Sequence, residues 1–92
     1  MDTKVNKLTQ LYKMQSHKAE RIVELIENHI PRLYTDVIIE RCKKNGIIVS
    51  DNVVKDVKLF RTKNVRVLNV ILEFARENRK AQRKLEQLAT GN

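Results

Sequence analysis

Hydrophobic residues recur at helical spacing along most of the chain and divide it into several predicted helices. From about residue 3 to residue 29 they follow steps of four and three, at Leu8, Tyr12, Ala19, Ile22 and Ile26. This spacing is typical of a helix that packs along a seam. Gln15 interrupts the series, and a Ser in the middle of such a pattern is compatible either with a continuous helix or with a new start. We therefore expect either one long scaffold helix over 3–29 or a short arm followed by a helix from His17.

The next predicted helix lies between Pro31 and Gly46. Pro31 lacks a backbone N–H and biases Ile30 away from helical geometry, so the first segment ends there. The new helix starts either at Pro31, as a first-turn residue, or at Thr35, as an N-cap. Its apolar side is formed by Val37, Ile38 and Cys42. Gly46 can adopt the positive φ that ends a helix.

A second short helix is predicted from Ser50, a favoured N-cap residue. Its apolar stripe consists of Val53, Val54 and Val57. The β-branched run 47–49 stands between the two short helices, and an isolated run of three residues has no visible strand partner. We expect all three of its side chains to fill the core beneath these helices.

The last helix is predicted from Asn64, as N-cap, to about Ala89. Its first half carries the core residues Val67, Leu68, Ile71, Leu72 and Ala75. Its second half keeps only a thin apolar line of Ala81, Leu85, Leu88 and Ala89 among basic residues. Such a line either pairs with another helix, from the N-terminal segment or a second copy, or frays at the end.

Together these elements predict an all-α fold in a single domain over residues 1–92. We expect about four to five helices, with a scaffold helix over 3–29, two short helices within 32–63 and a long helix over 64–89. One Pro and two Gly in 92 residues make a sheet with many turns unlikely.

Charge favours an anionic partner, because the net charge is +8. The positive excess is densest at Lys55, Lys58, Arg61, Lys63 and Arg66, which are accompanied by only two acidic residues, Asp51 and Asp56. No apolar stretch approaches the roughly twenty residues that span a bilayer, and no signal peptide is recognised. The single cysteine, Cys42, allows no intramolecular disulfide. We therefore expect a cytoplasmic protein.

Residue patterns of known chemistry are missing from the sequence. It contains no Gly-rich phosphate loop, no Cys/His cluster at zinc spacing and no plausible Ser/His/Asp set. Cys42 lies far in sequence from the two histidines, His17 and His29, that would have to activate it. We expect neither an enzyme nor a cofactor, a metal or a small-molecule substrate.

Small and apolar residues follow one another in a recognisable order through the two short helices and the turn between them. These residues are Cys42, Gly46, Val49, Ser50, Val54 and Val57, and a basic turn follows with Arg61, Lys63 and Asn64 before Ala75 and Asn78. This segment, about a third of the chain, resembles the helix-turn-helix of bacterial and phage regulators of the Cro and lambda-repressor type. Gly46 departs from the family pattern, because it stands three residues before Val49 rather than directly before it. The turn is therefore longer than is usual in the family.

The resemblance implies sequence-specific binding of double-stranded DNA by a transcriptional regulator. Asn52 suits an adenine edge and Lys55 can donate to guanine. Phosphate contacts would come from Lys58, Arg61, Lys63 and Arg66. Asp56 would repel phosphates unless it faces Lys55, Arg61 or a cytosine amino group. The alternatives are a helical protein-interaction module whose basic surface has no function of its own, and RNA binding, which the scattered aromatic residues disfavour.

Two apolar stripes lie outside the segments that close a core of short helices. One consists of Leu8, Tyr12, Ile22 and Ile26, and the other of Ala81, Leu85 and Leu88. A two-fold homodimer would bury both stripes and present two recognition helices to two half-sites. In the competing arrangement the N-terminal helix folds back on the C-terminal one within a monomer, at no cost in association entropy.

Overall fold

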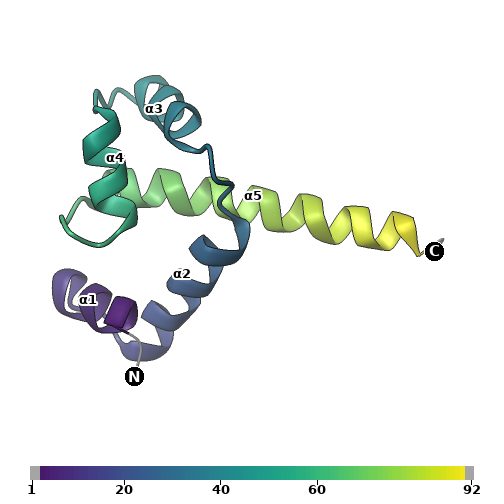
Figure 1. Cartoon of the computed structure of the whole chain (residues 1–92), viewed down its shortest axis with the longest axis horizontal. Helices are drawn as coiled ribbons and strands as arrows, with labels where there is room; N and C mark the ends of the chain where they lie inside the picture. Colours follow the sequence, from purple (N-terminus) through teal and green to yellow (C-terminus); the bar gives the residue numbers. More distant parts are fainter. Residues whose placement is uncertain (1–2, 91–92) are drawn as a thin grey trace.

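The computed structural model describes residues 3–90, and every regular element in that range is a helix. In chain order these are α1 (Thr3–Tyr12), α2 (Ser16–His29), α3 (Thr35–Lys44), α4 (Asp51–Lys58) and α5 (Val65–Ala89). Figure 1 shows α5 along the long axis of the molecule, with α3 and α4 on one side of it and α1 and α2 on the other. The prediction of a small all-α fold is confirmed.

The N-terminal segment forms two helices, so the single scaffold helix over 3–29 is wrong and the alternative with a break is correct. The break falls at residues 13–15, where Lys13 has a φ of 56°. The carbonyl of Gln15 then accepts hydrogen bonds from the N–H groups of Lys18 and Ala19, both at 3.1 Å. Because the chain reverses here, α1 packs on α2, and the side chains of Leu8 and Ala19 are both fully buried.

Caps fix the ends of the next helices largely as the sequence predicts. The side chain of Ser50 accepts a hydrogen bond from Val53 N–H at the start of α4, and Asn64 Oδ1 accepts one from Val67 N–H, at 3.1 Å, at the start of α5. α3 differs, because Tyr34 stands at its N-cap without a side-chain cap and Thr35 is its first residue.

α3 ends at Lys44, and Gly46, just past the C-cap Asn45, has the predicted positive φ, 75°. The N–H of Ile47 reaches back to the carbonyl of Cys42 at 2.8 Å, and that of Gly46 to Lys43 at 3.0 Å. These two bonds form a Schellman motif, which satisfies carbonyls that would otherwise lack partners.

The run 47–49 only partly fills the core, so that prediction is wrong for one residue. Ile47 and Val49 pack against the core, whereas Ile48 is 83 % exposed. The segment is not helical, and successive side chains of an extended chain point to opposite sides.

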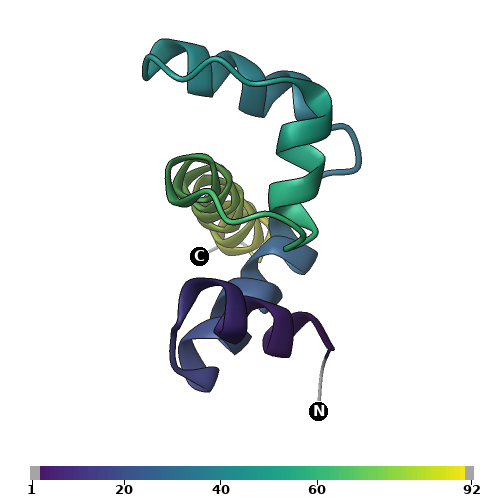
Figure 2. The ribbon, with the colours of Figure 1, turned by 90° about the vertical axis from the view of Figure 1, so that its left-hand side faces the viewer.

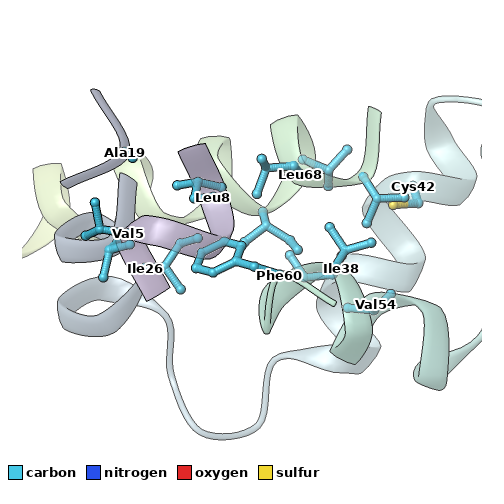
Figure 3. Packing of buried hydrophobic residues seen from close by; sticks show 14 residues of the cluster. Val5, Leu8, Ala19, Ile26, Ile38, Cys42, Val54, Phe60 and Leu68 are labelled. Atoms are coloured by element: carbon cyan, nitrogen blue, oxygen red, sulfur yellow. The ribbon is translucent and has the colours of Figure 1, made fainter. Parts of the chain in front are cut away.

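Phe60 closes α4 with the same motif as Gly46, although it is not a glycine. Its φ is 59°, its N–H donates to Val57 at 3.1 Å, and the N–H of Arg61 donates to Asp56 at 2.9 Å. The left-handed conformation costs an L-residue about 1–2 kcal/mol. Burial of the ring, which is only 5 % exposed, offsets this cost by about 1.5–3 kcal/mol. Figure 3 shows Phe60 in the middle of the core, with Leu8 and Ile26 on one side and Ile38 on the other.

The N-terminal apolar stripe belongs to this core, contrary to the expectation that it lies outside it. Leu8 and Ile26 are buried, Tyr12 and Ile22 pack against the cluster, and α2 packs along α5. This is the arrangement in which the N-terminal segment folds back on the C-terminal helix within one chain. The thin line on α5 is different, because residues 80–90 are all exposed and Leu85 and Leu88 are 60 % and 66 % exposed. This part of α5, here called the arm, projects from the rest of the molecule (Figure 1).

Candidate nucleic-acid interface

One side of helix α4 is buried in the core, and the other side is exposed to solvent. Val54 and Val57 are fully buried and face α3 and α5, which both contact α4. Asn52 and Lys55, the two predicted base readers, are exposed on the other side because helical spacing places them away from the valines. Figure 2 shows α4 running crosswise to α3 and beside the start of α5. The polar side of α4 is thus open to a large ligand.

Lys58 lies at the edge of that side and turns toward the body of the protein. Its Nζ atom is 4.9 Å from the centroid of the Tyr34 ring, a cation–π contact. Partial burial lowers the pKa of Lys58, the nearby charge of Lys4 lowers it further, and Glu27 opposes the shift. Glu27 itself pairs with Lys4, with Nζ and Oε1 at 2.7 Å. A phosphate contact from Lys58 would therefore compete with the Tyr34 ring.

The other three predicted phosphate ligands are also exposed: Arg61 and Lys63 on the segment that leads from α4 into α5, and Arg66 in the first turn of α5. Arg61 Nη1 lies 3.7 Å from Asp56 Oδ1, so Asp56 faces one of the three groups that would reduce its repulsion of phosphates. Arg66 Nη2 donates to the carbonyl of Asn45, at 3.4 Å. This bond joins the start of α5 to the end of α3.

Two lysines that the sequence analysis did not select lie next to this junction. Lys43 and Lys44 are exposed in the last turn of α3, adjacent to Asn45. The feature of the sequence that could have identified them was their position just before the predicted turn. We define the basic surface as Lys43, Lys44, Lys55, Arg61, Lys63 and Arg66.

Contacts to α5 hold the elements of the basic surface in place. Arg41 of α3 stacks on the Phe74 ring, 4.7 Å from its centroid, and forms an ion pair with Glu77. The hydrogen bond from Arg41 holds the pKa of Glu77 below its usual value. The hydroxyl of Tyr12 accepts a hydrogen bond from Asn64 N–H at 3.1 Å, which fixes the start of α5 against α1.

Within residues 3–90, no three side chains of His, Cys, Asp or Glu come together as metal ligands would. Cys42 is buried, and burial raises the pKa of its thiol, which therefore stays protonated. No helix in this range is long and apolar enough to cross a membrane. Compared with known protein families, curated proteins and solved structures, the chain has no significant match.

Proposed function

We propose that the chain binds double-stranded DNA and regulates transcription, with α3 and α4 acting as a helix-turn-helix. The observation that carries this proposal is α4 itself, whose valines are buried while Asn52 and Lys55 are exposed. α4 has eight residues and is therefore about 12 Å long. With its side chains an α-helix is about 10–12 Å across, so α4 fits the major groove of B-DNA, which is about 12 Å wide.

Each exposed residue has a role that follows from its chemistry. Asn52 would pair with adenine, and Lys55 would donate to guanine. The remaining cations of the basic surface would contact phosphates on either side of the groove. Asp56 would stay paired with Arg61, so that its charge is partly neutralised at the DNA backbone. DNA binding of this kind also fits the expected cytoplasmic location.

A titration with duplex DNA of random sequence at several salt concentrations tests this proposal. We expect the logarithm of the affinity to fall linearly with the logarithm of the salt concentration, with a slope of about −4 to −6. Lys55→Ala and Lys63→Ala should each weaken binding, because each removes a cation from the basic surface. Lys18→Ala, which removes an exposed cation from α2, should leave binding unchanged.

Two results of the titration would contradict DNA binding. One is no binding to duplex DNA even at low salt, and the other is an affinity that does not change with salt. Either would favour the helical protein-interaction module, in which the basic surface only keeps the chain in solution.

We further propose a homodimer, which now depends on the arm alone because the N-terminal stripe packs within the chain. Ala81, Leu85 and Leu88 lie along one side of the arm and would be covered by the arm of a second copy. Light scattering after size exclusion at about 100 μM should give twice the chain mass of 10.8 kDa. Leu85→Glu should give monomers and Lys84→Glu should not. A monomeric wild-type protein would rule out a stable dimer.

A further inference from the structure

α2 and the second half of α5 border a groove that lies apart from the basic surface. Its volume is about 600 Å³, and its apolar part is formed by Ile22, Leu25 and Leu72. Volumes of this order are usual for binding pockets in proteins. Arg66 in the basic surface and Arg79 in the groove are thirteen positions apart on α5, or about 20 Å along the helix axis. A ligand in the groove can therefore bind without contacting α4. Figure 1 shows the course of α2 and α5, the two helices whose residues line the groove.

The walls of the groove are rich in arginine. Arg21 of α2 and Arg76, Arg79 and Arg83 of α5 all line it. Nε of Arg79 is buried and has no hydrogen-bond partner among residues 3–90. Buried N–H groups in proteins nearly always have an acceptor. Because this atom is sealed from solvent, a carboxylate in the groove would instead pair with the exposed guanidinium groups of Arg21, Arg76 and Arg83, in the fork-shaped geometry that Arg forms with carboxylates.

Three kinds of occupant can be distinguished by charge and polarity. A nucleic-acid backbone is polar along its whole length and would leave the apolar residues without a partner. Four arginines against Glu24 and Glu86 leave the lining with a net positive charge, which favours an anionic occupant. The basic residues of a second copy's arm would be repelled by the arginines of the groove. The proposed homodimer uses a different side of the arm, with Leu85 and Leu88, which do not line the groove. A helix with apolar residues on one side and acidic residues beside them matches both the floor and the walls.

We propose that this groove binds an acidic amphipathic helix of a partner protein. Apolar side chains of the partner would lie on Ile22, Leu25 and Leu72, and its carboxylates would accept hydrogen bonds from the arginines. The arm extends one wall of the groove beyond α2, because Arg83 and Glu86 belong to it. This site is independent of DNA binding, which involves the other end of α5.

A synthetic peptide tests the proposal on the full chain. The probe has Leu at positions i, i+3, i+4 and i+7 of a helix and Glu at the others, and its binding is followed by calorimetry and by amide and methyl shifts in NMR. We expect shifts at Ile22, Leu25 and Leu72. Arg83→Glu should weaken binding about tenfold or more. Lys84→Glu, the same change of charge on an adjacent exposed residue outside the groove, should weaken it by less than about threefold.

Three results would overturn the proposal. The first is equal weakening by the two substitutions, and the second is equal binding of a peptide in which Ser replaces every Leu. Both would indicate attraction to positive charge alone. The third is a short DNA duplex that shifts the groove residues more strongly than the peptide, which would make the groove a nucleic-acid surface. The Leu and Ser peptides are both tested on the wild-type protein. Their comparison therefore tests the proposal even if a substituted variant fails to fold.

Discussion

Replacing Val54 by Asp is expected to unfold the domain. Val54 is fully buried where α4 meets α3 and α5. An unpaired carboxylate at such a position costs several kcal/mol, against a total stability of about 5–15 kcal/mol for a small domain. Circular dichroism at 222 nm during heating should show loss of the cooperative transition or a midpoint far below that of the wild type.

The adjacent residue provides the control for this substitution. Lys55 is exposed, and Lys55→Ala should change the stability by no more than about 0.5 kcal/mol. The pair thus separates folding from the proposed DNA binding within one helix. A Val54→Asp protein that melts like the wild type would show that α4 is not packed through its valines.

Phe60→Ala is expected to destabilise the protein by about 3–5 kcal/mol, the usual effect of removing a buried phenyl group. For a domain of this size that corresponds to a fall in melting temperature of at least about 12 °C. Leu59→Ala is the matched control, because Leu59 is the preceding residue and is 39 % exposed. It should cost less than about 1.5 kcal/mol.

The positive φ of Phe60 gives this prediction a second part with an unusual sign. Glycine normally stabilises a protein less than alanine does, but at φ 59° it avoids the steric cost that alanine retains. Phe60→Gly should therefore be more stable than Phe60→Ala by about 1 kcal/mol in urea denaturation. If Phe60→Gly is less stable than Phe60→Ala, residue 60 does not adopt the left-handed conformation.

The features that the sequence predicts well are those set by neighbouring residues. Ser50, Asn64 and Gly46 each act within four residues of their own position, and all three end or begin helices as expected. The buried side of α4 follows from the spacing of its valines in the same way. For the candidate site, this local pattern was enough to place Asn52 and Lys55 on the exposed side.

Features that depend on distant residues could not be predicted in this way. The turn at Lys13 contains neither Gly nor Pro, and it forms because α1 gains a core contact by folding back on α2. Spacing alone identified the stripe on the first segment but not the helix that covers it. In the site, Lys58 contacts Tyr34 and Arg66 contacts Asn45, and both partners are more than twenty positions away.

The arm illustrates how a helix can persist although every one of its residues is exposed to solvent. Nucleation is the unfavourable step of helix formation, and for α5 it is complete within the buried residues near its start. The arm needs only propagation, one hydrogen bond for each added residue, whereas a free peptide of the same sequence would be mostly coil. A protein that binds the arm therefore meets a surface already in its final conformation, and the entropy lost on association is correspondingly smaller.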